Sequence, residues 1–318
     1  MPLHSIPPHA LSNGLLASPE QAERWCAYLE SGMILYFPRS PLPVPRTDIE
    51  FLLNRKPAGG KFHEDIFYDP YRDRLRGADR NASSSEEIER LRLIMHRFSA
   101  NAVRLLSGFL TPYERGWRID YASFKANGEA GHTRSQPRRN DLLQIDAFPA
   151  RPARGWRILR FFANIHPAKT CDWMTGEPFP RILGAFWPTI LATPRGEGRA
   201  IRAARRFAES TGLTSLAPWL KRTPYDRFML ELHDAMKHDA QFQRTCPKET
   251  LQFAPGSCWM IYTDTVPYAI RAGQYTLEQT LFVDPAANVT HGSAPLTLLE
   301  EIAGAKLGSA STTKARNT

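Results

Sequence analysis

Cysteine is scarce in this chain of 318 residues, which has four of them. Cys26, Cys171, Cys246 and Cys258 lie far apart, and no two form a CxxC pair. That spacing argues against a zinc ribbon and a redox-active dithiol, both of which need closely spaced thiols. We therefore expect four buried thiols without disulfide partners.

The sequence also lacks an apolar run of the roughly 18 residues that a membrane-spanning helix needs. Its N-terminal segment has no basic stretch leading into an apolar one, which a secretory signal would show. We expect a cytoplasmic protein, and peripheral contact with a membrane surface stays open.

Acidic residues are fewer than basic ones, 32 against 41, which gives a net charge of +9. This excess favours anionic partners, and among nucleic acid, anionic lipid and phosphorylated glycolipid the charge alone does not choose. No specific nucleic-acid signal accompanies it. The most basic stretch contains one acid, Glu197, among five arginines: Arg195, Arg199, Arg202, Arg205 and Arg206. A solvated helix face is the commoner explanation for such a run, and a patch for an anionic ligand is the other.

Two helices are predicted in the first 110 residues. Ser18 followed by Pro19 opens a helical pattern in segment 18–36, and Ser84 caps a longer one that runs to about residue 107. Residues 38–82 are rich in proline, glycine, arginine and aspartate, so we expect an irregular packed segment there. This N-terminal region, 1–110, is predicted to pack on the rest of the fold.

After residue 111 the pattern changes to short runs typical of β-strands. They cover 117–124, 142–148, 157–165, 257–262 and 275–283. Many short strands with turn signals indicate a mainly β fold with flanking helices, a jelly roll or sandwich, over residues 111–285. One helix, 223–244, is inserted and opens with Thr223 and Pro224. Residues 286–318 form an extension whose Ser/Thr-rich end we expect to be disordered.

Polar side chains are expected inside the strand region. In 142–148 the alternation of faces puts Gln144 and Asp146 on one side. In 157–165 it puts Arg160 and Asn164 on one side. A buried arginine needs an anion, either a ligand or a protein carboxylate such as Asp146 or Glu278.

Four blocks of sequence resemble the Kdo hydroxylase family. They are LLQIDAFPARPARGWRILRFFANIHP (142–167), DWMTGEPF (172–179), PYDRFMLELHDAMKHDAQFQ (224–243) and FAPGSCWMIYTDTVPYAIRAGQYTLEQTLFV (253–283). The resemblance implies a cupin-like double-stranded β-helix and an oxidoreductase, a dioxygenase that hydroxylates the Kdo sugar of lipopolysaccharide with Fe(II), 2-oxoglutarate and O2.

The resemblance also implies where the iron ligands should be, namely an HxD pair and a distant histidine. In this chain the pair falls on Gln144 and Asp146, and the distant histidine falls on Tyr268, so only the carboxylate of the triad is kept. An amide oxygen and a neutral phenol are poor ligands for Fe(II). Arg160 resembles the family's cation for 2-oxoglutarate, with Asn164 as a further cofactor contact.

Other side chains could complete such a site. We consider His166 and His132 as substitute metal ligands, and Gln279 and Thr280 as additional polar contacts. The remaining histidines are expected to have packing or surface roles.

Three functions stay open. The first is Fe(II)- and 2-oxoglutarate-dependent hydroxylation of an anionic sugar or glycolipid with an altered ligand set. The second is a metal-independent enzyme, for example of specialised metabolism, in which Asp146 acts as a base and Tyr268 as a proton donor, with Gln144 beside them. The third is a non-catalytic binding protein that keeps the fold.

Overall fold

The computed structural model describes residues 3–7, 16–55, 65–78, 83–126, 139–192 and 222–308. Three features of the sequence lie outside these ranges: the arginine-rich stretch, His132, and the tail from residue 309.

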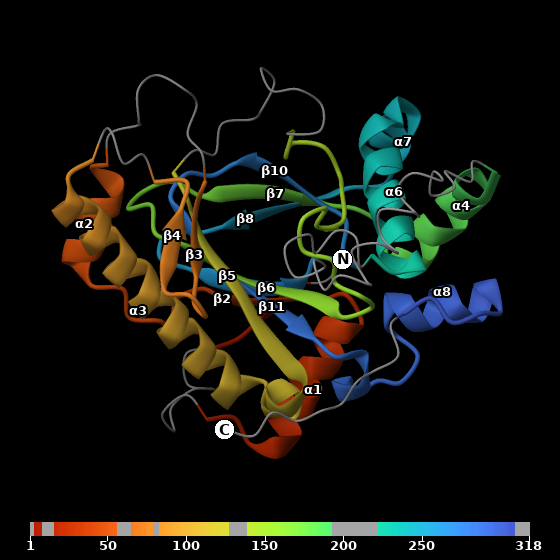
Figure 1. Cartoon of the computed structure of the whole chain (residues 1–318), viewed down its shortest axis with the longest axis horizontal. Helices are drawn as coiled ribbons and strands as arrows, with labels where there is room; N and C mark the ends of the chain where they lie inside the picture. Colours follow the sequence, from red (N-terminus) through yellow and green to blue (C-terminus); the bar gives the residue numbers. More distant parts are fainter. Residues whose placement is uncertain are drawn as a thin grey trace, which may run out of the picture.

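Two β-sheets form the centre of the described fold (Figure 1). The larger has eight strands in the order β1 (Leu3–Ser5), β2 (Ile34–Phe37), β9 (Cys258–Tyr262), β6 (Arg157–Asn164), β11 (Thr276–Val283), β5 (Trp117–Lys125), β3 (Ile66–Asp69) and β4 (Arg74–Arg76). The smaller has the order β10 (Tyr268–Ala272), β7 (Cys171–Thr175) and β8 (Glu249–Phe253). Except for the parallel pair β1–β2, these strands pair antiparallel. The arrangement is the predicted jelly roll.

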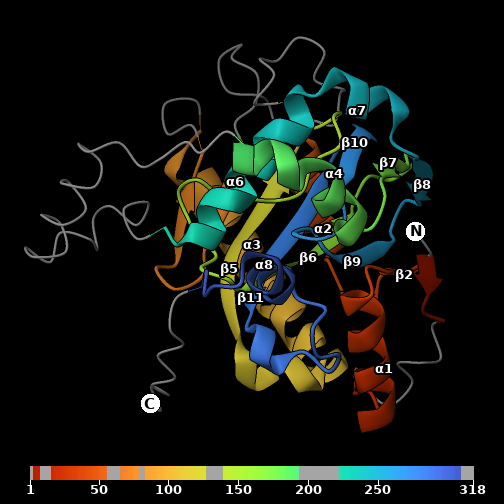
Figure 2. The same cartoon turned by 90° about the vertical axis from the view of Figure 1, so that its right-hand side faces the viewer.

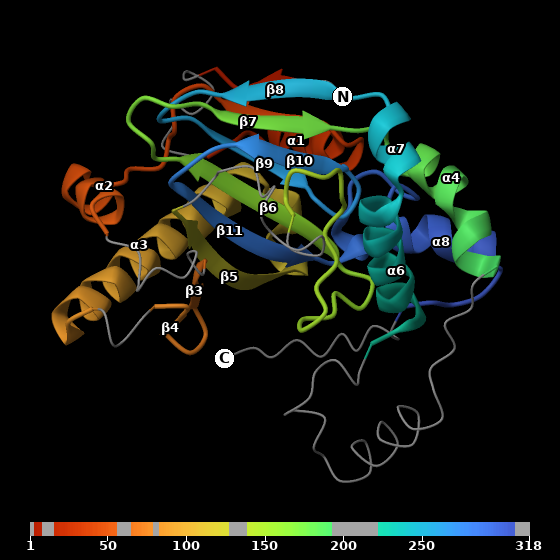
Figure 3. The same ribbon diagram turned by 90° about the horizontal axis from the view of Figure 1, so that it is seen from above.

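Helices cover the outer face of the larger sheet and one end of the molecule. They are α1 (Pro19–Glu30), α2 (Arg46–Leu53), α3 (Ser85–Phe109), α4 (Phe179–Ala192), α6 (Pro224–His238), α7 (Ala240–Thr245) and α8 (Pro295–Ala303), with 3-10 turns η2 (Thr111–Gly116) and η6 (Pro285–Ala287). Figure 3 shows α3 running along the sheet, and Figure 2 looks at the end where α4, α6 and α8 gather.

Local capping explains where three helices begin. Ser18, Ser84 and Thr223 each accept a hydrogen bond from the third backbone N–H of their helix, and the residue at that position returns one. Such capping boxes satisfy donors that a helix start otherwise leaves unpaired. The three predicted helix starts are thereby confirmed.

The buried side chains fall into separate layers. One cluster joins α1 and α3 to the outer face of the larger sheet. A second, rich in aromatic residues, fills the space between the sheets and includes Phe162, Trp173, Trp259 and Tyr268. A third joins α4, α6 and α8 to Leu143 and Ile145. The inner face of the sheet is therefore apolar around Phe162, and the polar cluster described below adjoins it.

The structure corrects several of the predicted elements. Segment 142–148 is not a strand, since its one ladder contact is an isolated bridge. Segment 38–82 contains α2, β3 and β4. The helix predicted over 223–244 breaks at Asp239, which caps α7. Short strands such as β7, β8 and β10 were not predicted, and neither were α4 and α8.

Two predictions made from absences can be compared with the described residues. All four cysteines are free and buried, as expected. In the ranges that the structure covers, none of the helices combines the length and the apolar character needed to cross a membrane.

Candidate functional site

The segment that carries Gln144 and Asp146 is held by hydrogen bonds from three directions. Gln144 and Tyr268 exchange both backbone bonds, at 3.1 and 2.9 Å, and the Asp146 N–H donates to the carbonyl of Thr263 at 2.7 Å. From the helical side, the imidazole of His233 on α6 bonds the Ile145 carbonyl at 2.6 Å. The segment is therefore fixed although it forms no strand.

The three positions that the resemblance assigns to iron lie together. Gln144 and Tyr268 are directly opposite each other in an antiparallel bridge, so their side chains leave the backbone on the same side. The Tyr268 hydroxyl donates to Oδ1 of Asp146 at 2.9 Å. Gln144, Asp146 and Tyr268 are all buried, with 5%, 7% and 3% of their surface exposed.

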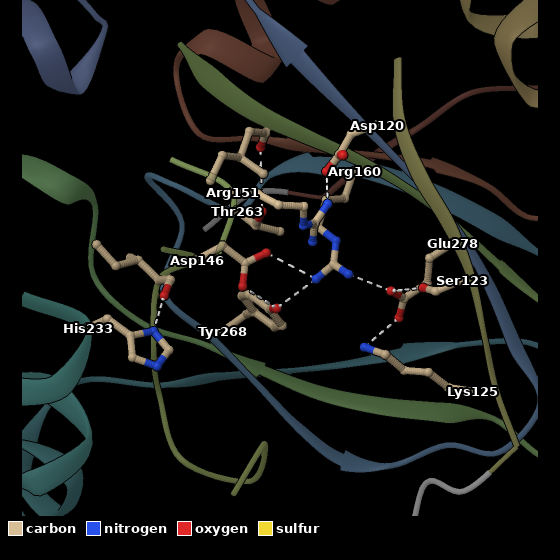
Figure 4. Close-up of polar contacts among 12 residues, drawn as sticks. Asp120, Ser123, Lys125, Asp146, Arg151, Arg160, His233, Thr263, Tyr268 and Glu278 are labelled. Atoms are coloured by element: carbon tan, nitrogen blue, oxygen red, sulfur yellow. Dashed lines mark hydrogen bonds and ion pairs between the residues drawn. The ribbon is translucent and has the colours of Figure 1, made fainter. Parts of the chain in front are cut away.

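Arg160 on β6 points into the same group, as Figure 4 shows. Its Nη1 donates to Oδ2 of Asp146 at 3.0 Å and lies 3.2 Å from the Tyr268 hydroxyl. Its Nη2 donates to Glu278 on β11 at 2.5 Å. Arg160 thus contacts both carboxylates that the sequence suggested as its partners.

Glu278 has further contacts on β5. The Ser123 hydroxyl donates to Glu278 at 2.9 Å, and the Lys125 ammonium lies 2.8 Å from its other oxygen. We call Asp146, Tyr268, Arg160, Glu278 and Lys125 the barrel cluster. It holds two carboxylates and two cations, so its charges balance.

Burial and pairing set the protonation of the barrel cluster. Burial raises the pKa of the Tyr268 phenol well above its ordinary value, and the Asp146 carboxylate adds to this. For Arg160 burial acts to lower the pKa, but Glu278 and Asp146 outweigh it and hold the pKa above the usual range. Burial acts to raise the pKa of Glu278, yet Arg160 and Lys125 keep it below its ordinary value. A neutral phenol at Tyr268 therefore lies beside the charged pair of Arg160 and Glu278.

Some predicted site residues do not join the barrel cluster. The amide nitrogen of Asn164 donates to the carbonyls of Lys169, Phe253 and Ala254, so it fastens backbone turns at the far end of β6. The Nδ1 atom of His166 accepts two backbone N–H bonds in the same turn.

The two weaker candidates on β11 separate. Gln279 accepts a hydrogen bond from Ser99 on α3 at 2.7 Å, which places it on the outer face of the sheet. Thr280 is buried directly opposite Arg160 and shares its face. The prediction that both residues share the face of Arg160 is therefore wrong for Gln279 and confirmed for Thr280.

Sequence reasoning missed Ser123, Lys125 and His233. The two β5 residues lie more than 150 positions from Glu278 in the chain, and no local pattern reveals such pairing. The histidine looked like any packing residue on a helix. The one available signal was its place in the block 224–243 that resembles the family.

Comparison with known proteins agrees with the fold and with the quoted blocks. A family model described as 3-deoxy-D-manno-oct-2-ulosonic acid (Kdo) hydroxylase matches residues 13–306. The chain belongs to the Kdo hydroxylase family. A search among curated protein sequences gave no match.

Solved structures of the Kdo hydroxylase KdoO, described as a non-heme Fe(II) α-ketoglutarate-dependent dioxygenase, are similar over the full length. The apo structure has 31% identity and a TM-score of 0.82, and the cobalt(II) complex has 30% and 0.83. The complex with α-ketoglutarate and Fe(III) has 29% and 0.82. Each comparison covers 99% of this chain and 100% of the other. This family membership supports an enzyme with the fold of the 2-oxoglutarate oxygenases.

In this chain, the side chains of Gln144, Asp146 and Tyr268 do not form a donor set that fits Fe(II). Both oxygens of Asp146 are engaged, one by Arg160 and one by Tyr268. The Tyr268 phenol stays protonated, and an amide oxygen is a weak donor for this metal. Among the described residues, no three His, Cys, Asp or Glu side chains gather in a way that could hold a metal ion.

The same geometry bears on 2-oxoglutarate. The family resemblance implies that Arg160 would bind a carboxylate of this cosubstrate. Here both of its terminal nitrogens already bond protein carboxylates. Its buried Nε has no hydrogen-bond partner among the described residues.

Proposed function

We propose that this member of the Kdo hydroxylase family is an enzyme that transfers protons on a Kdo-type anionic sugar, without iron or 2-oxoglutarate. The observation that carries the proposal is that both carboxylate oxygens of Asp146 are hydrogen-bonded, one to the Arg160 guanidinium and one to the Tyr268 phenol, at the position that the resemblance assigns to iron. Family membership supports the choice of substrate class.

Asp146 and Tyr268 supply the acid and base functions in this scheme. Asp146 would take the proton from the carbon beside the sugar's carbonyl, and Tyr268 would donate a hydrogen bond, then a proton, to the carbonyl oxygen. Once Asp146 is protonated, it no longer raises the pKa of the phenol, so the two steps assist each other. Return of both protons regenerates the enzyme and the sugar.

Arg160 and Gln144 would position these groups and the substrate. Arg160 bonds Asp146 and lies against Tyr268, so one side chain fixes both. The Oε1 atom of Gln144 is buried and accepts no hydrogen bond from the described residues. That oxygen is suited to a hydroxyl of the sugar, which would satisfy it.

Proton exchange on Kdo tests the proposal. The protein, stripped of metal by a chelator, is incubated with Kdo in D2O, and proton NMR follows the signal of the carbon beside the ketone. We expect deuterium to enter at that carbon without added Fe(II) or 2-oxoglutarate. Asp146→Asn should slow exchange by about a hundredfold or more, the usual contribution of a general base. Asp141→Asn, which alters a carboxylate paired with Arg139 outside the barrel cluster, is the control.

Two outcomes would refute this function. Kdo that binds without exchange in any condition would make the chain a binding protein. Consumption of Kdo that requires both Fe(II) and 2-oxoglutarate would make it a hydroxylase with an altered ligand set. That second candidate is supported by the family match and by the similarity to KdoO.

A further inference from the structure

The inner face of the larger sheet continues from the barrel cluster to its edge at β4. Glu278 pairs with Ser123 across β11 and β5, Ser123 pairs with Phe67 on β3, and Phe67 pairs with Arg76 on β4. Residues paired in this way share a face of the sheet. Arg74 lies two residues before Arg76 and therefore shares it too. A line of side chains thus links the cluster to two arginines at the rim.

Two arginines near this line of side chains, Arg76 and Arg151, lie over aromatic rings. The guanidinium of Arg76 lies 5.5 Å from the ring centre of Tyr121, and that of Arg151 lies 4.6 Å from the same ring. Arg151 also lies 4.5 Å from the centre of Phe148. Stacking of this kind holds a guanidinium in place and leaves its N–H edge free to bind.

Positive charge is in excess at this rim. Arg74 and Arg76 are exposed, and neither has a carboxylate partner among the described residues. Arg72 of the same hairpin differs, since it pairs with Asp69 at 3.1 Å. Burial lowers the pKa of Arg151 to about 10, and the positive charges of Arg160 and Arg76 contribute. Arg151 does contact Asp120, so the unbalanced charge belongs to the β4 arginines.

Edge strands often carry basic residues only to prevent sheets from joining. That role needs charges along the free edge, but it does not require a guanidinium stacked on Tyr121 over the inner face. Edge protection alone therefore does not account for the position of Arg76.

We propose that Arg74, Arg76 and Arg151 form a phosphate-binding subsite beside the barrel cluster. The inference rests on the proposed function and adds to it that the sugar substrate is phosphorylated. A phosphate ester carries a charge of about −1.5 to −2 at neutral pH, which matches the two unpaired arginines. Arginine also suits phosphate because its planar donors bind two oxygens at once.

Binding of inorganic phosphate tests the subsite by calorimetry. We expect the double variant Arg74→Gln with Arg76→Gln to bind phosphate about tenfold to a hundredfold more weakly than the unaltered protein, because charge-assisted hydrogen bonds are lost. Arg104→Gln is the matched control, since Arg104 is an exposed arginine on α3, away from the inner face. Circular dichroism establishes that each variant is folded.

A second arm separates the sources of phosphate. Flotation with phosphatidylcholine vesicles, with and without phosphatidic acid, is compared between the same proteins. Vesicle binding that needs phosphatidic acid and both arginines, without binding of inorganic phosphate, would assign the subsite to a lipid headgroup. Binding of inorganic phosphate alone would assign it to a soluble sugar phosphate.

The two proposals can fail separately. Equal phosphate affinity in the double variant and the unaltered protein, or an equal loss in Arg104→Gln, overturns the subsite even if Kdo exchanges protons. Phosphate binding that depends on the two arginines upholds the subsite even if Kdo does not exchange.

Discussion

At the scale of single residues, a guanidinium bonds the carboxylate that the family resemblance assigns to iron. Asp146 keeps its position, but its two oxygens face Arg160 and Tyr268. Arg160 is in turn neutralised by Glu278, so each buried charge has a partner. Removing one member of such a group leaves another charge buried alone, which is far more costly than losing the attraction itself.

The first prediction concerns Arg160. Arg160→Met should lower the free energy of unfolding by about 3–5 kcal/mol, because it leaves Asp146 and Glu278 without their shared cation. Combining it with Glu278→Gln should restore part of that loss. Urea unfolding measures both, and Arg46→Met, at an exposed pair with Glu50, should cost about 1 kcal/mol or less. A loss no larger than that of Arg46→Met would show that the barrel cluster is not held by this pairing.

The second prediction is a pH dependence from Glu278. Its pKa is lower in the folded protein than in the unfolded chain, so the stability it contributes is fully present above the ordinary glutamate pKa of about 4.3. That contribution is lost as the pH falls through the lower, folded value. Unfolding measured across this acid range should therefore show a shallower slope in Glu278→Gln. If the free energy of unfolding depended on pH equally in both proteins, Arg160 and Lys125 would not be lowering the pKa of Glu278.

Several contacts of the site were predictable from the chemistry of single residues. The other contacts depend on which strands pair in the sheet. Burying a cation at Arg160 required an anion, which pointed correctly to Asp146 and Glu278. Lys125 became a neighbour only because β5 pairs with β11. The same pairing puts Gln279 on the opposite face, against α3, which the sequence did not show.

At the scale of elements, the segment that carries Asp146 shows why alternation alone misleads. Leu143 and Ile145 are buried opposite Gln144 and Asp146, as the pattern predicted. A strand also needs a neighbouring strand whose backbone pairs with its N–H and C=O groups. Here the side chains of His233 on α6 and Gln243 on α7 bond three of these groups instead. The capped helices were easier to predict because a capping box is written in four consecutive residues.

The third prediction tests this anchoring. The Gln243 amide accepts from the Leu143 N–H at 3.0 Å and donates to the Leu143 carbonyl at 2.9 Å. Gln243→Ala should cost about 1–3 kcal/mol, since it removes the partners of both the backbone N–H and the backbone C=O of Leu143. Hydrogen exchange should rise in segment 142–148, as mass spectrometry of its peptides can measure. Gln241→Ala, at an exposed position of α7, should leave the segment protected, and equal protection in both variants would refute the anchoring role.

At the scale of the whole molecule, the described part of the N-terminal region contributes four strands to the larger sheet. β1 and β2 extend it beyond β9, and β3 and β4 extend it beyond β5, at opposite ends. Segment 38–82 looked irregular because its strands are only three or four residues long and its helix has eight. Sequence patterns of that length cannot be told from turns.

The fourth prediction is that residues 1–110 do not form a separate module. Apolar faces of α1 and α3 lie in the same core as β6, β9 and β11, so cutting the chain near residue 110 would expose both sides. Limited proteolysis should give no stable fragment of 1–110, and the two parts should unfold in one transition. Release of a folded 1–110 fragment would contradict this.

The central claim is that Asp146 pairs with Arg160 and Tyr268 instead of binding iron. Its most direct test is the iron content after anaerobic loading with Fe(II) and desalting, compared between the unaltered protein and the double variant Gln144→His with Tyr268→His. We predict little iron in the unaltered protein and more in the variant, because two imidazoles then join the carboxylate as donors suited to Fe(II). Stoichiometric iron in the unaltered protein, lost on Asp146→Asn, would contradict the claim.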